Sequence, residues 1–329
     1  MLALRAVLAA TDFSPSSDYA LHLAWSLAQD HRARLVVLHV ASRSAVRYGD
    51  IVAPLAEGGY KDNAWKALRR LQWPDGTVPV DLRVDQGDPA REIIRLAREL
   101  SCDMIVMGTH GRTGLERLFV GSVAEQVMRK ASCPVLTVKS LGFQDDDPSE
   151  ESSLEENWEQ HAMTPIRTIL HATDFSEHAK TAFHLSCSLA RDHEARLIVL
   201  HVAEPVLDYR GTASLVYGDA GGMLQATVEN HKEQLKEKLR QFALPEPPVE
   251  ADYEVVEGDA AEQILGYVQK TKADLVVMGT HGRTGLARLL MGSVAEQIVR
   301  RSSCPVLTLK TPFAEAQDSP EPTQGSTSR

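Results

Sequence analysis

The sequence predicts an α/β protein made of two similar domains, each a parallel sheet with helices on both faces. The chain has 329 residues, of which 43% are hydrophobic, and this is long enough for two separate cores. A stretch of 20 residues that begins at Met107 recurs from Met278 with 17 identical positions. In both halves short apolar runs alternate with helical patterns, which is typical of a parallel sheet with right-handed crossovers.

The first strand of each half runs directly into a helix. Residues 4–10 are expected to form this strand, after which Ser14 offers an N-cap with Pro15 at the first helical position. The counterpart spans residues 166–176. Because this second copy lies in mid-chain, the apolar N-terminus is better explained as a strand than as a signal peptide.

The second strands, residues 35–40 and 197–202, both end in His-Val. We interpret His39 and His201 as hydrogen-bonded structural histidines, because no nucleophile lies beside them in sequence. Residues 41–59 look irregular, and the matching stretch 203–222 is rich in Gly and Tyr. From the His-Val strand to the next Gly-Asp pair the second half is nine residues longer, so the difference is expected in a surface loop.

A helix and a third strand come next in each half. The helices are expected over 62–71 and 224–242, and the strands over 78–84 and 249–256. Each strand is followed by Gly-Asp, at Gly87 and at Gly258, which opens a third helix. Asp88 and Asp259 are most simply read as helix N-caps.

The fourth strands, residues 103–107 and 274–278, lead into a loop with the glycine spacing G-x2-G-x9-G-Ser. Ser122 is a candidate N-cap for the helix that follows, with Glu125 three residues later. This helix ends near Ser132, and fifth strands are expected over 134–139 and 305–310.

Glycines between a buried strand and a helix N-terminus suit an anionic ligand. They allow close approach of the backbone, and the helix start offers unpaired N–H groups with a partial positive charge. The spacing is neither that of a P-loop nor a G-x-G-x-x-G fingerprint. Arg112 and Arg283 are candidates for extra positive charge, against the alternative that they are solvated loop residues.

Charge and cysteine content narrow the function class. The net charge is −10, and residues 140–165 hold eight of the acidic side chains with no Lys or Arg. We therefore expect residues 141–165 to be an acidic linker and 312–329 to be a disordered tail, between and after domains at 1–140 and 166–311. The domains carry no basic stripe for nucleic acid. The four cysteines lack metal spacing and resemble reduced core thiols. No apolar run is long enough to cross a membrane, so we expect a soluble, cytoplasmic protein.

The Thr-Asp-Phe-Ser end of the first strand, the Leu-His-Val end of the second and the glycine loop together resemble the universal stress protein family. The match covers both halves, so the chain resembles a tandem member. The resemblance implies Rossmann-like domains of the adenine nucleotide alpha hydrolase-like kind, with sheet order 3-2-1-4-5. It places the chain with the ATP-binding branch, because members without these glycines form the branch that does not bind ATP. In relatives a proline often precedes Thr-Asp, where Ala10 and Ala172 stand here.

The resemblance implies that Asp and Val at the ends of the first two strands hold adenine and ribose, while the glycine loop and its Ser hold phosphates. The alternative for the two aspartates is a turn carboxylate. The candidate ligand-binding residues of the first half are Thr11, Asp12, Val40, Met107, Gly108, His110, Gly111, Arg112, Gly121, Ser122 and Val123. Those of the second half are Thr173, Asp174, Val202, Met278, Gly279, His281, Gly282, Arg283, Gly292, Ser293 and Val294.

These residues lead to three hypotheses of function. The first is a regulatory ATP-binding protein of the stress response, with two sites and with Mg²⁺ or Mn²⁺ as companions of the phosphates. The second is a slow ATPase or adenylate-transferring enzyme, for which no sequence pattern selects a catalytic residue. The third is a nucleotide-free scaffold whose glycines only tighten a turn. Family dimers pair strand five across a two-fold axis, so we expect residues 135–139 and 306–310 to pair within the chain and hide two apolar edges. A protein partner and a further homodimer are open.

Overall fold

The computed structural model describes residues 4–41, 46–48, 51–53, 57–71, 73–74, 76–109, 120–139, 166–204, 220–242, 249–280 and 291–310. For 46–48, 51–53, 57–60 and 220–228 the description is of the backbone alone. The expected acidic linker and C-terminal tail lie outside the described residues.

Each half alternates strands and helices as the sequence predicts. The first half contains β1 (Ala6–Thr11), α1 (Pro15–Asp30), β2 (Arg34–Ala41), α2 (Glu57–Arg70), β5 (Val80–Gln86), α3 (Pro89–Glu99), β6 (Met104–Gly108), α4 (Ser122–Lys130) and β7 (Val135–Val138). The second half contains β8 (Thr168–Thr173), α6 (Glu177–Asp192), β9 (Arg196–Ala203), α8 (Ala220–Phe242), β10 (Ala251–Glu257), α9 (Ala260–Thr271), β11 (Leu275–Gly279), α10 (Ser293–Arg301) and β12 (Val306–Leu309).

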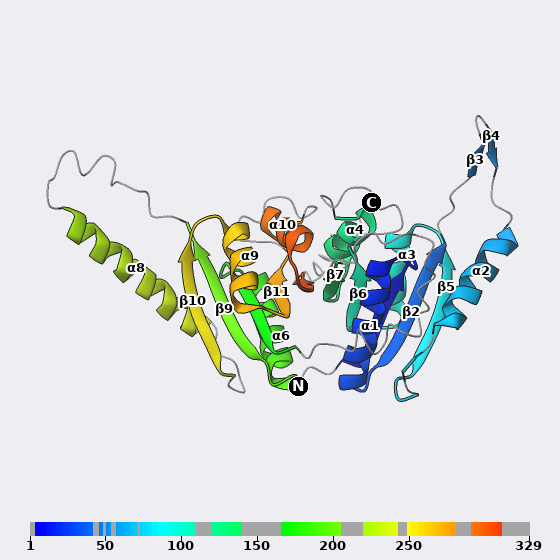
Figure 1. Cartoon of the computed structure of the whole chain (residues 1–329), viewed down its shortest axis with the longest axis horizontal. Helices are drawn as coiled ribbons and strands as arrows, with labels where there is room; N and C mark the ends of the chain where they lie inside the picture. The colour runs from blue at the N-terminus through cyan, green and yellow to red at the C-terminus, as the bar shows by residue number, and fades with distance from the viewer. Residues whose placement is uncertain are drawn as a thin grey trace, which may run out of the picture.

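The two halves share one ten-stranded sheet of order β10-β9-β8-β11-β12-β7-β6-β1-β2-β5 (Figure 1). Each half therefore has the expected order 3-2-1-4-5 with parallel neighbours. The join is the antiparallel pair β7–β12, in which Leu136 lies opposite Leu307. The expected intramolecular pairing of the two fifth strands is confirmed, and it hides two apolar edges.

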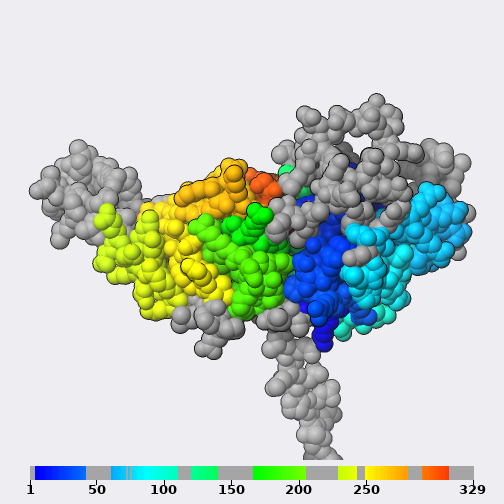
Figure 2. Space-filling model, turned by 60° about the horizontal axis from the view of Figure 1, so that its bottom comes forward, coloured from blue at the N-terminus to red at the C-terminus, as the bar shows by residue number. Residues whose placement is uncertain are grey.

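Helices cover both faces of the sheet and enclose two apolar layers. Side chains of α1, α2, α6 and α8 pack on one face, with Leu68, Phe183 and Leu239 fully buried there. Side chains of α3, α4, α9 and α10 pack on the other face. Figure 2 shows the second half's green surface directly against the first half's blue one.

Several local predictions need correction at their boundaries. Residues 41–59 are not wholly irregular, because β3 (Val46–Tyr48) and β4 (Ile51–Ala53) form an antiparallel pair and α2 begins at Glu57. Helix α8 likewise begins four residues earlier than expected, and α4 ends at Lys130. The predicted caps Ser14, Asp88 and Asp259 are confirmed by hydrogen bonds to the first helical turn. None of the described helices is long and apolar enough to cross a membrane.

Candidate functional site

The ends of β1 and β8 lie where the direction of strand order reverses in each half. β1 pairs with β2 on one side and β6 on the other, with Thr11 opposite His39 and Ala10 opposite Met107. In the second half β8 lies between β9 and β11 in the same way. Asp12, which follows β1, therefore lies at the same carboxyl edge as Val40 and Gly108, which are near or at the ends of β2 and β6. Open α/β sheets bind ligands at such a switch point.

The turn after β1 is held by Asp12. Its Oδ1 accepts hydrogen bonds from the Ser14 backbone N–H at 3.1 Å and from Ser14 Oγ at 2.6 Å. In the second half Asp174 Oδ1 accepts from the Ser176 N–H at 3.0 Å. The interpretation of both aspartates as turn carboxylates is confirmed. Their contact with a ligand stays a prediction.

Histidine and phenylalanine brace the two strand ends. The Nδ1 of His39 donates to the Thr11 carbonyl at 2.9 Å, and His201 repeats this contact with Thr173. The ring of Phe13 lies 4.6 Å from that of His39, and Phe13 adopts a φ of 62°. The structural role expected for the histidines is confirmed. The sequence does not predict this role of Phe13, because no sequence pattern marks a positive φ at an aromatic residue. The only hint is that the second half also has phenylalanine at the matching position, Phe175.

Packing accounts for three of the conspicuous glycines. A Cβ at Gly108 would lie 2.7 Å from Ser16 Oγ and 3.0 Å from the Ser16 carbonyl carbon, both in the first turn of α1. A Cβ at Gly279 would lie 3.0 Å from His178 Cβ, and one at Gly121 would lie 2.9 Å from the Thr109 carbonyl oxygen. These positions favour glycine whether or not a ligand binds.

The two ends of each glycine loop are tied together. The N–H of Thr109 donates to the Val138 carbonyl at 2.8 Å, and the N–H of Gly121 donates to the Thr109 carbonyl at 2.8 Å. Thr280, Leu309 and Gly292 repeat both bonds at 2.9 Å. The N-termini of α4 and α10 are thereby fixed at the bases of their loops. Six candidate residues lie outside the described residues: His110, Gly111, Arg112, His281, Gly282 and Arg283.

The predicted cap at Ser122 is wrong by one residue. The N-cap is Gly121, whose carbonyl accepts from the Glu125 N–H at 3.0 Å, and the second half has Gly292 in this position. Ser122 and Ser293 are the first helical residues instead, followed by Val123 and Val294. Neither N-terminus has a side-chain cap, whereas α1, α3, α6 and α9 each have one. The first N–H groups of α4 and α10 thus lack the side-chain acceptor that the N-cap residues of α1, α3, α6 and α9 provide.

A second carboxylate lies close to Asp12. Asp18, in the first turn of α1, has its pKa raised to about 6 by burial and, to a smaller extent, by repulsion from Asp12. The repeat places Lys180 at the matching position of the second half, where it is exposed. The two candidate sites therefore differ in charge beside the first strand, although their glycine loops are almost identical.

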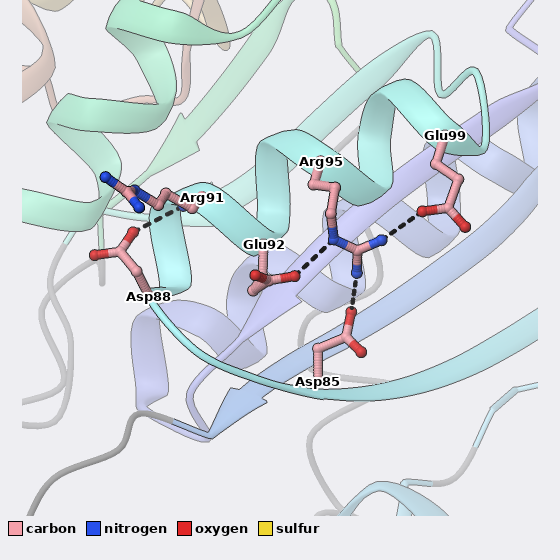
Figure 3. A network of polar contacts seen from close by, with 6 residues as sticks. All are labelled: Asp85, Asp88, Arg91, Glu92, Arg95 and Glu99. Atoms are coloured by element: carbon pink, nitrogen blue, oxygen red, sulfur yellow. Dashed lines mark hydrogen bonds and ion pairs between the residues drawn. The ribbon is translucent and has the colours of Figure 1, made fainter.

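The halves also differ beside the third strand. In the first half Arg95 of α3 pairs with Asp85 of β5 and Glu92 at 2.7 Å each, and also with Glu99 (Figure 3). The repeat places Gly266 where Arg95 stands in the first half, so α9 lacks this ion cluster. All the charged groups of the cluster are at the surface, where ion pairs contribute little to stability.

Comparison with known proteins decides the family. The family model described as "Universal stress protein family" matches residues 3–139 and again 165–310. The chain belongs to the universal stress protein family. The resemblance of both halves to that family is confirmed.

Some of these relatives match one half of this chain over most of their own length, and others match almost the whole chain. One from Thermus aquaticus is 37% identical over 145 residues, which cover 44% of this chain and 99% of the relative. One from Methanocaldococcus jannaschii is 33% identical over 151 residues, covering 45% of this chain and 85% of the relative. A Mycobacterium tuberculosis universal stress protein is 26% identical over 318 residues, covering 92% of this chain and 96% of the relative.

One solved structure has a similar fold over almost the whole chain. A universal stress protein from Archaeoglobus fulgidus superposes with a TM-score of 0.61 at 20% identity, covering 94% of this chain and 99% of that one. Another universal stress protein was solved in complex with cAMP. At 25% identity it covers 42% of this chain and 98% of that one, with a TM-score of 0.32.

Proposed function

We propose that this universal stress protein binds ATP at two sites and acts as a regulatory protein whose conformation responds to the nucleotide. The observation that carries the proposal is the pair of helix N-termini, on α4 and α10, without side-chain caps at the switch-point edge of the sheet. Such ends bind phosphate through their N–H groups and their dipole. The pattern occurs in both halves, which supports two sites per chain.

The proposed roles follow the order of groups along the nucleotide. Asp12 and Val40, with Asp174 and Val202, are assigned to adenine and ribose. We assign the ribose hydroxyls to the carboxylate of Asp12, whose Oδ1 also accepts hydrogen bonds from Ser14 in the turn. The N-terminal residues of α4 and α10 and their preceding loops are assigned to the phosphates.

Mg²⁺ or Mn²⁺ is proposed as a companion of the phosphates. Among the described residues no group of three or more His, Cys, Asp or Glu side chains is arranged to hold a metal ion. An ion bound with the nucleotide would rely on phosphate oxygens for part of its coordination. A requirement for metal is tested by titrating ATP with and without Mg²⁺.

A nucleotide-free scaffold is the second candidate, and the packing of Gly108, Gly121 and Gly279 favours it. If the glycines served packing alone, their spacing would carry no information about a ligand. The two functions differ in one measurable property, because only the first requires the chain to bind nucleotide.

The experiment is native mass spectrometry of the purified chain, followed by calorimetric titration of the stripped protein with ATP and Mg²⁺. Two adenine nucleotides per chain are expected. AMP, ADP and cAMP are titrated alongside ATP to define the ligand. No bound mass together with no heat of binding would support the scaffold.

Two variants locate the binding. Asp12→Asn and Asp174→Asn keep an oxygen for the turn but remove the charge that would accept a ribose hydroxyl. Each is expected to weaken one site by about 10-fold to 100-fold, since a hydrogen bond to a charged group contributes about 1.5–3 kcal/mol. Asp62→Asn, at an exposed position on α2, is the matched control and is expected to bind as the wild type does. Unchanged affinity at both sites in the double variant would contradict the assignment of the aspartates.

A further inference from the structure

Two lysine side chains make hydrogen bonds from one half of the molecule to the other. Lys139 follows β7, and its Nζ donates to the carbonyl oxygen of Arg300 in α10 at 3.4 Å. Lys310 follows β12, and its Nζ donates to the carbonyl oxygen of Arg129 in α4 at 3.2 Å. Both contacts are partly buried. The two contacts are equivalent under the sequence repeat. Each half therefore places one lysine ammonium group against a helix of the other half.

The acceptors lie where a helix most favours a cation. Arg129 and Arg300 are in the last turns of α4 and α10, where backbone carbonyls have no partner within the helix. The C-terminus of a helix also carries a partial negative charge, which an ammonium group stabilises. Each lysine therefore anchors the C-terminal end of a helix that belongs to the opposite half.

The anchored helices are short and begin at the proposed nucleotide sites. α4 and α10 have nine residues each, which corresponds to about 14 Å at 1.5 Å per residue. Their N-termini are fixed at the other end by the bonds from Gly121 to Thr109 and from Gly292 to Thr280. A shift at the lysine end of a helix this short changes the direction of its first N–H groups.

The contacts close into a ring that includes both sites. Thr109 is bonded to Val138, and the next residue, Lys139, holds α10, whose N-cap is Gly292. Gly292 is bonded to Thr280 and Thr280 to Leu309. The next residue, Lys310, then holds α4, which leads back through Gly121 to Thr109. Within this ring, the two lysine side chains make the contacts between the halves, and the other hydrogen bonds join backbone groups of the same half.

The interface does not depend on the lysines for its formation. β7 and β12 pair through their backbones, and Thr137 Oγ1 donates to the Val306 carbonyl at 3.1 Å. Thr308 Oγ1 donates to the Val135 carbonyl at 3.3 Å in the symmetric contact. Replacing a lysine should therefore leave the two halves joined.

We propose that Lys310 is a positioning residue for the nucleotide site of the first half and Lys139 for that of the second half. Each site is then complete only when the other half is in place. The part of this inference that concerns nucleotide rests on the proposed function. The part that concerns helix anchoring stands on the contacts alone, and the two parts are tested separately.

The first test uses the whole chain without nucleotide. Lys310→Met and Lys139→Met keep most of the stem and remove the ammonium group. Hydrogen exchange followed by mass spectrometry should show amide exchange in the last turn of α4 several times faster in Lys310→Met, with α10 unchanged. Lys139→Met should show the reverse. Lys232→Met, at an exposed position on α8, is the control and should change neither helix. Exchange that changes in both helices, in neither, or in the helix of the lysine's own half would overturn the inference.

The second test measures affinity at one site at a time. Asp174→Asn isolates the first site and Asp12→Asn the second, and ATP is titrated into each with and without a lysine replacement. Lys310→Met is expected to weaken the first site by about 3-fold to 10-fold and to leave the second unchanged. Lys139→Met should do the opposite. A crossed effect on exchange in a protein that binds no nucleotide would support the anchoring and contradict the proposed function. Equal affinities with and without each lysine would overturn the positioning role.

Discussion

Gly108 shows how a single residue can have its type decided by packing at the edge of a candidate site. A Cβ at this position would meet both the side chain and the backbone of Ser16, at 2.7 and 3.0 Å. Gly108→Ala must therefore move the first turn of α1, and we expect a loss of about 1–3 kcal/mol in the free energy of unfolding. Urea denaturation measures it.

The control for Gly108→Ala is Gly76→Ala, because nothing lies within 4 Å of a Cβ built at Gly76. Gly279→Ala provides a graded comparison, since its closest contact is 3.0 Å and we expect a smaller loss than at Gly108. An unchanged urea midpoint for Gly108→Ala would show that α1 adjusts without cost and that packing does not fix the residue type.

At this scale the sequence predicts which residues matter better than it predicts why. The interval between the glycines marks Gly108 and Gly121 as special, and the favoured reason was contact with phosphate. The described contacts add a packing reason: an added Cβ at Gly108 would meet Ser16, which is distant in sequence, and one at Gly121 would meet the carbonyl of Thr109 at the other end of the loop. Such a reason is visible only when the chain is folded.

Helices α3 and α9 are equivalent elements stabilised in different ways. Arg95 of α3 joins three carboxylates, whereas Gly266 takes its position in α9, where it is exposed and nothing lies within 4 Å of an added Cβ. Gly266→Ala is expected to raise the free energy of unfolding by about 0.5–1 kcal/mol, because alanine loses less backbone entropy on forming a helix. The shift in the urea midpoint measures it, and a lower midpoint would show that α9 tolerates no side chain there.

The order of elements follows from the sequence, but their boundaries do so only in part. Buried runs such as β2 and β6 are apolar throughout and are recognised directly. The third strand, β5, has partly exposed, charged residues and runs two residues beyond the predicted end. The β3–β4 pair was missed because three-residue strands show no periodicity.

The whole molecule is organised about the join between its halves, and a cluster of His and Asp side chains also links the two halves. His31 and His193 end α1 and α6, and their rings are 5.8 Å apart. Each faces a carboxylate of the other half, with Nδ1–Oδ2 distances of 3.9 Å from His31 to Asp192 and 3.8 Å from His193 to Asp30. The repetition of His-Asp pairs at the same spacing was present in the sequence. Their meeting across the interface requires the pairing of β7 with β12.

This cluster predicts that acid weakens the contact between the halves. Burial lowers the pKa of His193 below its ordinary 6.5, and neighbouring His31 lowers it further, while Asp30 and Asp192 oppose the shift only in part. Below pH 6.5 His193 therefore binds fewer protons in the folded protein than in the unfolded chain, so its contribution to the free energy of unfolding falls as the pH drops. His171, fully buried with its pKa lowered to about 3, acts in the same direction. A comparison of variants is needed to separate the two histidines.

His193→Gln removes one titrating group from the cluster and keeps a polar side chain of similar reach. Thermal unfolding measured from pH 7.5 to 5.5 should show a smaller loss of stability in this variant than in the wild type, because the variant no longer has to exclude a proton at the interface. His231→Gln, at an exposed position on α8, should follow the wild-type curve. If His193→Gln and the wild type lost stability in parallel, burial of His193 between the halves would not be a source of the pH dependence. The contact between the halves would then be equally stable with His193 protonated or neutral. This is expected if the backbone pairing of β7 with β12 alone holds the halves together.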